Sequence, residues 1–217
     1  MGNGAGQTSQ GNSAVALGNR AGNSNQGSQA IALGAYAGYN TQGSGAVALG
    51  NQAGYNTQGL NAVALGNVAG LQLQGANAIA LGYGAGNYTQ ANNSIAIGAY
   101  AGNYTQGNGA VALGYGAGNS NQGNSAIAIG NNAGVSYQAS NSIVLNASGT
   151  QLNGSTANSF YVRPMRALAA ATAIYYNTAT FEISYLASDA RLKRNILTIE
   201  DGLNSVKKLN PVSYEYR

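Results

Sequence analysis

Large aliphatic residues alternate with alanine in a short motif that recurs every 16 residues through roughly the first two-thirds of the chain. In one such unit, Ile31 and Leu33 alternate with Ala30 and Ala32, and Gly34 follows directly. This period-2 pattern predicts a short β-strand with one face of large side chains and one face of small ones. The motif begins at Ala14, Ala30, Ala46, Ala62, Ala78, Ser94, Ala110, Ala126 and Ser142. Such regular spacing predicts an all-β fold, a parallel β-roll or solenoid of 16-residue coils.

Glycine and glutamine recur at fixed positions of the repeat. Glycine fills two columns without exception, from Gly18 to Gly130 and from Gly22 to Gly134. Because glycine tolerates positive φ, these columns predict the corners at which each coil turns. Glutamine fills a third column, which consists of Gln10, Gln26, Gln42, Gln58, Gln74, Gln90, Gln106, Gln122 and Gln138. Since stacked coils lie about 4.8 Å apart, we expect the glutamine amides to form a ladder of hydrogen bonds between coils.

The two faces of the repeated strand lead to a prediction about assembly. Each unit supplies only two large aliphatic residues and several alanines, so a coil has a thin core and a single rod is marginally stable. The alanine face is flat and lacks bulky side chains. We therefore expect a homo-oligomer whose chains approach one another along the alanine face.

The repeat ends after Leu145, and the chain divides into three predicted parts. We expect a β-solenoid rod over residues 1–146, a β-rich connector or neck over 147–187, and a further short module over 188–217. Residues 173–176 and 181–185 of the neck fit two strands joined by a turn. In the last part, residues 199–209 have a helical pattern that ends at Pro211, and residues 212–216 fit a strand. We therefore expect a short α+β fragment at residues 188–217.

Composition excludes several classes of function. The 217 residues include 33 Gly, no Cys, no His and no Trp, and only 6% are charged. Arg20 is the one charged residue before Arg163, so the net charge of +4 arises near the C-terminus. A nucleic-acid groove needs Lys and Arg along the repeats, and a metal site needs His, Cys or carboxylate ligands. We expect no nucleic acid and no metal.

Cofactor binding and membrane insertion are not expected either. Glycine-rich segments such as 82–86 lack the Lys-Ser/Thr pair and the βαβ context of a phosphate-binding loop. The longest apolar run, residues 167–176, is too short to span a bilayer.

Nine tyrosines lie in the repeats, in columns whose occupants vary from unit to unit. Variable columns of a solenoid face outward, and Tyr among Asn, Thr and Gln suits stacking and hydrogen bonding with a glycan or a protein receptor. The candidate binding residues are Tyr36, Tyr39, Tyr55, Tyr88 and Tyr104. A second interpretation, equally open, is that the tyrosines only cover the corners of the rod. Ice binding by a threonine ladder is disfavoured, because Thr fills its column only at residues 41, 57, 89 and 105.

Residues 61–66 (Asn-Ala-Val-Ala-Leu-Gly) and 93–98 (Asn-Ser-Ile-Ala-Ile-Gly) resemble the head repeats of trimeric autotransporter adhesins. That family forms left-handed parallel β-rolls assembled as homotrimers. The resemblance implies that Val, Ile and Leu lie inside each roll and that trimer contacts run along the rod. The 16-residue period with its Ala-Gly and Gln columns is more similar to the versions found in fibre proteins of large viruses and phages.

Residues 188–196 (Ser-Asp-Ala-Arg-Leu-Lys-Arg-Asn-Ile) resemble the start of the intramolecular chaperone auto-processing domain of phage tailspikes, endosialidases and viral fibres, and residues 209–216 fit it as well. The resemblance implies a chaperone that trimerises the fibre and then cleaves itself off. It implies Ser188 as the nucleophile at the Ser188–Asp189 bond and Lys193 as the general base, a role that needs a Lys pKa lowered by burial. We expect no turnover enzyme, and at most one self-cleavage per chain.

The sequence thus predicts a homotrimeric fibre shaft of a virus or phage, located on the virion surface or extracellular, that displays an extended rod for host attachment. The alternative is the head domain of a bacterial trimeric surface adhesin. Identical repeats specify register weakly, because sliding one chain by a whole unit restores nearly every contact. We expect the unlike residues from Phe160 onward to fix the register of the trimer.

Overall fold

The structure is a computed structural model, and it describes residues 2–166 and 174–185 of the 217-residue chain. The chain divides into two compact units between Met165 and Arg166. In the second unit, β18 (Ile174–Tyr176) and β19 (Ile183–Tyr185) form an antiparallel hairpin, as the alternation in the sequence predicts. The helix expected over residues 199–209 and the strand expected over 212–216 lie outside the described residues.

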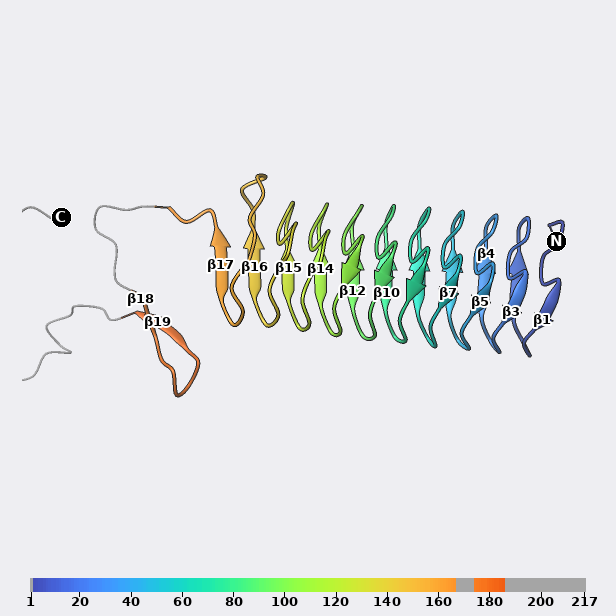
Figure 1. The fold of residues 1–217 in the computed structure, drawn as a ribbon, viewed down its shortest axis with the longest axis horizontal. Helices are drawn as coiled ribbons and strands as arrows, with labels where there is room; N and C mark the ends of the chain where they lie inside the picture. Colours follow the sequence, from blue (N-terminus) through green and yellow to red (C-terminus); the bar gives the residue numbers. More distant parts are fainter. Residues whose placement is uncertain (1, 167–173, 186–217) are drawn as a thin grey trace, which may run out of the picture. The chain divides into compact units, whose positions relative to one another are not determined.

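Two long parallel sheets run along the first unit (Figure 1). The ten-stranded sheet consists of β2 (Val15–Leu17), β4 (Ile31–Leu33), β6 (Val47–Leu49), β8 (Val63–Leu65), β10 (Ile79–Leu81), β12 (Ile95–Ile97), β14 (Val111–Leu113), β15 (Ile127–Ile129), β16 (Ile143–Asn146) and β17 (Phe160–Arg163). The seven-stranded sheet consists of β1 (Thr8–Gln10), β3 (Ser24–Gln26), β5 (Thr41–Gln42), β7 (Thr57–Gln58), β9 (Leu73–Gln74), β11 (Thr89–Gln90) and β13 (Thr105–Gln106).

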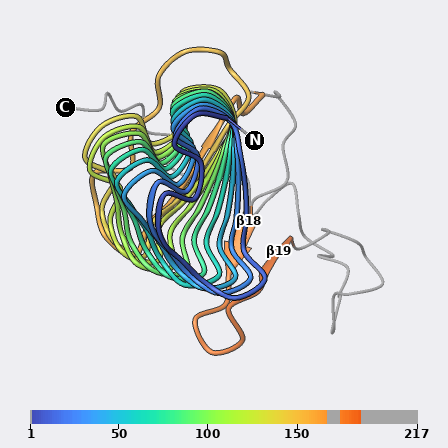
Figure 2. The same cartoon turned by 90° about the vertical axis from the view of Figure 1, so that its right-hand side faces the viewer.

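Neighbouring strands of the repeats pair at a step of one repeat. Ile31 pairs with Val47 and Leu33 with Leu49, so the same column of the sequence continues from coil to coil. Figure 2, viewed along the rod, shows successive coils stacked nearly in line. The predicted all-β parallel solenoid of 16-residue coils is therefore confirmed, and the described residues contain no helix.

The two glycine columns form corners of the coil, as predicted. Gly50 has φ 133° and Gly54 has φ 55°, conformations that L side chains rarely adopt. Space is also limiting: a Cβ on Gly50 would lie 2.6 Å from the carbonyl oxygen of Gly66, and one on Gly54 would lie 2.8 Å from Oε1 of Gln58. Both corners thus need glycine for backbone conformation. Gly50 also leaves room for the next coil, and Gly54 leaves room for the glutamine side chain of its own coil.

Alanine and glutamine fill the interior of the coils. Ala48 of β6 and the corner residue Ala53 are fully buried, and so are their counterparts in the neighbouring coils. The opposite wall contributes glutamine, and Gln42 and Gln58 are each only 1% exposed. Val144 replaces alanine in β16 and is the large aliphatic residue of this core. The interior is therefore narrow, with alanine on one side and an amide side chain on the other.

Two expectations about the strand faces are wrong. Val, Ile and Leu do not lie inside each roll, since Leu33 and Leu65 are 38% and 37% exposed. Chains also cannot meet along the alanine face, because Ala32 and Ala64 are buried within their own coils. The physical reason is space: a glutamine that crosses the coil leaves room for a methyl group opposite it, so the large aliphatic residues face outward.

Each buried glutamine amide makes hydrogen bonds across the coil and along the rod. Nε2 of Gln58 donates to the carbonyl oxygens of Val47, at 2.7 Å, and Ala62, at 3.2 Å. Oε1 of Gln58 accepts from Nε2 of Gln42 in the preceding coil, at 3.1 Å. The glutamine column is therefore a structural ladder, as predicted, and it also joins the two sheets of each coil.

The end of the rod departs from the repeat. β17 pairs with β16, so that Phe160 lies beside Ile143 and Val162 beside Leu145. Asn146, which is 3% exposed, donates from Nδ2 to the carbonyl oxygens of Asn131 at 2.8 Å and Thr150 at 2.6 Å. These bonds hold the longer loop over residues 147–159 against the last full coil. The ten-stranded sheet thus continues past the repeats as far as Arg163.

Replacing Gln58 by leucine keeps the approximate size of the side chain and removes its amide. Nε2 of Gln42 and the carbonyl oxygen of Val47 then lose a buried partner, so we expect a loss of about 1–3 kcal/mol in the free energy of unfolding. Urea denaturation followed by circular dichroism measures this loss. The control is Thr57→Val on the exposed side of the same strand, for which we expect a change within about 0.5 kcal/mol. Equal stability of the two variants would contradict the role of the amide.

Candidate functional site

Two columns of large apolar side chains point outward from the ten-stranded sheet, and together we name them the apolar stripe. The first column consists of Val15, Ile31, Val47, Val63, Ile79, Ile95, Val111, Ile127, Ile143 and Phe160. The second column consists of Leu17, Leu33, Leu49, Leu65, Leu81, Ile97, Leu113, Ile129, Leu145 and Val162. The more exposed members range from 36% at Leu49 to 52% at Phe160.

The apolar stripe has the character of a protein–protein interface. It is continuous from β2 to β17, it contains no charged side chain, and it presents apolar area on the order of several hundred Å². Soluble monomers rarely expose an apolar patch of that extent. The large aliphatic residues thus lie on the face opposite to the one that the sequence predicted for contacts between chains. The overlooked signal was the glutamine column, because a buried amide needs the space that the aliphatic residues were expected to fill.

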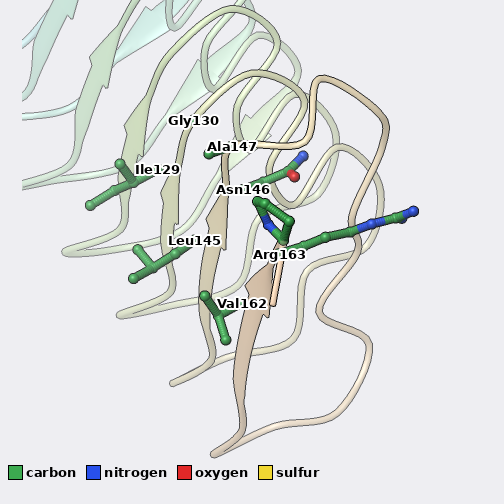
Figure 3. A pocket seen from close by; sticks show the side chains of 8 residues that line it. Ile129, Gly130, Leu145, Asn146, Ala147, Val162 and Arg163 are labelled. Atoms are coloured by element: carbon green, nitrogen blue, oxygen red, sulfur yellow. The ribbon is translucent and has the colours of Figure 1, made fainter. Parts of the chain in front are cut away.

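A shallow hollow lies at the C-terminal end of the stripe (Figure 3). Ile129, Leu145 and Val162 contribute their aliphatic side chains from three successive strands. In Figure 3 these side chains lie on one side of the strands, whereas the Arg163 side chain extends away on the other. The remaining lining residues are Gly130, Asn146, Ala147, Arg163 and Pro164. The hollow is therefore an apolar feature that is continuous with the stripe.

The structure brings the five candidate tyrosines together in two groups. Tyr39 and Tyr55 are stacked, with ring centroids 5.0 Å apart and an interplanar angle of 10°, and Tyr36 lies 5.6 Å from Tyr39. Tyr88 and Tyr104 form a second stack, at 5.1 Å and 4°. Each stacked pair is one repeat apart in sequence, so the distance between the rings follows from the spacing of the coils.

Stacking decides which parts of these rings a ligand can reach. Within each pair one ring face covers the other, so the edges and hydroxyl groups face solvent together with the outermost face. Tyr88 and Tyr104 are 47% and 50% exposed, whereas Tyr36, Tyr39 and Tyr55 are half-buried. The Tyr88–Tyr104 pair is therefore the more accessible of the two groups, and it offers hydroxyl groups and the outer face of each ring.

A third group, formed by Tyr83, Tyr100 and Tyr115, lies outside the candidate binding residues predicted from the sequence. Tyr100 makes edge-to-face contacts with Tyr83, at 5.2 Å and 82°, and with Tyr115, at 6.1 Å and 90°. Hydrogen bonding with the Tyr83 side chain is the main cause that raises the pKa of Tyr100 above its ordinary value. Tyr83 and Tyr115 are 51% and 55% exposed. In the sequence, these tyrosines alternate between two neighbouring columns of the repeat. Tyr83 and Tyr115 lie in one column, and Tyr100 lies in the next.

The residues assigned to self-cleavage, Ser188 and Lys193, lie outside the described residues. Within residues 2–166 and 174–185, no three or more His, Cys, Asp and Glu side chains gather where they could hold a metal ion. Across the same ranges, no helix has the length and apolar character needed to cross a membrane.

Comparison with known proteins connects the C-terminal segment with a family. Residues 188–217 match the family described as Chaperone of endosialidase, which confirms the resemblance based on residues 188–196 and 209–216. No curated protein and no solved structure matches the chain. A β-solenoid of short repeats followed by a segment of this chaperone family fits a phage fibre head repeat with its chaperone domain. This combination is similar to that of phage tail fibre and tailspike proteins.

Proposed function

We propose that the chain forms the shaft of a homotrimeric phage fibre, a rod that holds a host-attachment surface away from the virion. The observation that carries the proposal is the apolar stripe, which follows one face of the rod from β2 to β17. Three parallel copies that turn their stripes toward a common axis remove this apolar surface from water. The match of residues 188–217 to a chaperone family supports assembly assisted from the C-terminal end.

The energetic balance of one coil supports the same proposal. Inside a coil the apolar contribution comes mainly from alanine, which buries little surface, while the larger aliphatic side chains remain outside. Burying a Val, Leu or Ile side chain contributes about 1.5–3 kcal/mol when burial is complete. Complete burial of the side chains of the stripe would therefore stabilise the protein more than burial of the alanines inside the coils does. Association of copies along the stripe would bury these side chains. A bacterial adhesin head uses the same kind of rod, but the chaperone segment favours a fibre.

For attachment, we propose that the exposed tyrosines of the rod contact a host glycan or protein receptor. The uncharged surface with Tyr88 and Tyr104, accompanied by the exposed Thr89 and Thr105, supports recognition of a neutral polar ligand such as a sugar. Hydroxyl and amide groups at regular spacing suit a polysaccharide, whose hydroxyl groups also repeat. A role on the virion surface or outside the cell follows from this proposal.

For maturation, we propose that the Ser188–Asp189 peptide bond is cleaved once the trimer has formed. Lys193 takes the proton of the Ser188 hydroxyl group, which adds to the carbonyl carbon of this bond, and Lys193 returns the proton to the amino group of Asp189 as it leaves. Water then hydrolyses the resulting ester, which leaves a free carboxylate at Ser188. The support is the match of residues 188–217 to the chaperone family together with the positions of the two residues within it. Such a reaction occurs once per chain. It would make trimer assembly irreversible by removing the segment that assists it.

The stripe can be tested with Leu65→Asp, which puts a charge at the middle of the second column. Leu65 is 37% exposed in a single chain, so the variant should keep its β-type circular dichroism spectrum. Burying a carboxylate without a partner at an interface is strongly unfavourable, so we expect the trimer to dissociate to monomers in sedimentation analysis. Thr57→Asp, on the exposed side of the other sheet, is the control and should remain trimeric. A monomeric unmodified chain, or a trimeric Leu65→Asp variant, would contradict the proposal.

The receptor surface can be tested by replacing Tyr88 and Tyr104 with serine. Ser24 and Ser120 occupy the same column in other coils, so the rod tolerates serine there. If each ring contributes about 0.5–1.5 kcal/mol to binding, the double variant should bind a surface glycan on an array at least about fivefold more weakly. The control is Tyr137→Asn, which matches Asn25 and Asn121 of its column. Unchanged glycan binding would show that the two tyrosines only cover the surface of the rod and do not bind the glycan.

Self-cleavage can be tested by intact-mass measurement after expression of the complete reading frame. We expect a species that ends at Ser188 from the unmodified chain, and none from Ser188→Ala or Lys193→Gln. Ser184→Ala, four residues upstream, should be cleaved like the unmodified chain. If the unmodified chain is found only uncut, the segment acts as a chaperone without cleavage.

A further inference from the structure

The apolar stripe determines which face of the rod associates, but over most of its length it does not determine how far one copy is shifted along another. From β2 to β16 the first column contains Val or Ile, and the second contains Leu or Ile. A shift by one coil, about 4.8 Å, therefore replaces each contact by one of nearly the same size. Any residue that sets the register has to interrupt this uniformity.

The interruption lies in β17, where both columns change size in opposite directions. The first column gains a phenyl ring, because Phe160 follows Ile143. The second column loses a methylene group, because Val162 follows Leu145. Phe160 is the one aromatic side chain of the stripe, and it is 52% exposed. One strand thus carries both an enlarged and a diminished side chain on the same face.

Val162, the shorter side chain, lies at the border of the hollow described above. Val162 borders it together with Ile129 and Leu145, and the space amounts to about 370 Å³. The lining is apolar toward the stripe, since the Arg163 side chain extends away from these three aliphatic residues (Figure 3). No charged group therefore opposes the entry of an apolar side chain from that side.

We propose that Phe160 of each copy inserts into this hollow of a neighbouring copy and thereby fixes the axial register of the fibre. The inference rests on the proposed homotrimer. In a ring of parallel copies the contact is heterologous, so that one edge of the stripe meets the opposite edge of the next copy. Phe160 of the first column then lies at the height of Val162 in the second column of its neighbour. The enlarged side chain meets the diminished one in this register.

A shifted register loses this fit. With a shift of one coil in one direction, Phe160 faces Leu145 and the ring competes with a larger side chain for space. With a shift in the other direction, Phe160 extends beyond the end of the neighbouring sheet at β17. All contacts from β2 to β16 remain nearly equivalent in both cases. Register discrimination is therefore concentrated in one strand.

Disulfide trapping between copies tests the register directly, because the chain contains no cysteine. Full-length chains with Val63→Cys are co-expressed with chains that carry Leu65→Cys, Leu49→Cys or Leu81→Cys. The first combination reports the aligned register, and the other two report a shift by one coil in either direction. Cross-linked pairs are quantified by non-reducing electrophoresis and mass spectrometry. We expect the aligned pair to exceed each shifted pair by about tenfold or more.

Phe160→Ala should bring the three cross-linking yields to within about twofold of one another. The matched control is Ile143→Ala, which shortens the preceding member of the same column and should preserve the preference for the aligned pair. Phe160→Leu, an apolar replacement of intermediate size, should retain part of the preference. Each variant is first checked for trimer formation by sedimentation.

The outcomes separate this inference from the proposed function. A Phe160→Ala trimer that keeps the aligned preference would overturn the register role of Phe160 and leave the trimer intact. A monomeric unmodified chain, together with the absence of every cross-link between the cysteine variants, would overturn the trimer itself. Equal loss of preference in Phe160→Ala and Ile143→Ala would also overturn the inference, because the effect would then belong to the stripe as a whole.

Discussion

The hydrogen bond between a buried glutamine amide and the opposite strand is the constraint on which the rest of the solenoid depends. Gln58 reaches across its coil to the carbonyl oxygen of Val47, at 2.7 Å. The Nε2 group of an amide in this position needs an acceptor, because burial of a donor without a partner is costly. Its length also sets the distance between the two sheets. The alanines follow from that distance, since only a methyl group fits opposite the glutamine.

The outward direction of the large aliphatic residues is a consequence of the same constraint. A strand has two faces, and the face that does not fit inside must point to solvent or to another chain. In this rod the face with the greater hydrophobic content is outside, an inversion of the usual arrangement of a single domain. The large aliphatic side chains are therefore only partly covered by the coils of their own chain, which is the basis of the homotrimer proposed above.

The fold could be predicted from the sequence, but the strand face that points into the coil could not. The 16-residue period, the glycine corners and the glutamine ladder are local and periodic, so each could be derived without coordinates. Alternation of Ala with Ile and Leu, by contrast, is the same pattern whichever face is inside. Side-chain size alone favours the aliphatic face for the core, and the adhesin resemblance reinforced that choice. The deciding quantity was the space that Gln58 occupies, which depends on the opposite wall of the coil.

For the tyrosines, the outward position could be predicted from the sequence, but the group around Tyr100 could not. Variable columns indicated an outward position, and Tyr88 and Tyr104 are indeed about half exposed. The edge-to-face group around Tyr100 alternates between two columns, and a search within single columns does not detect it. The roles of Ser188 and Lys193 remain predictions from the family, because they concern residues outside the described ranges.

The glutamine ladder also has a direction. Gln26 donates to Gln42, Gln42 to Gln58, Gln74 to Gln90 and Gln122 to Gln138, in each case from one coil to the following one. Gln106 donates to Gln122 in the same direction. No such bond joins Gln58 to Gln74 or Gln90 to Gln106, and Oε1 of Gln74 and Oε1 of Gln106 are buried without a partner. The ladder therefore consists of three separate runs that share one direction. Within a run, an additional 16-residue coil would receive a donor from the coil before it and supply a donor to the coil after it, and it would lengthen the rod by about 4.8 Å.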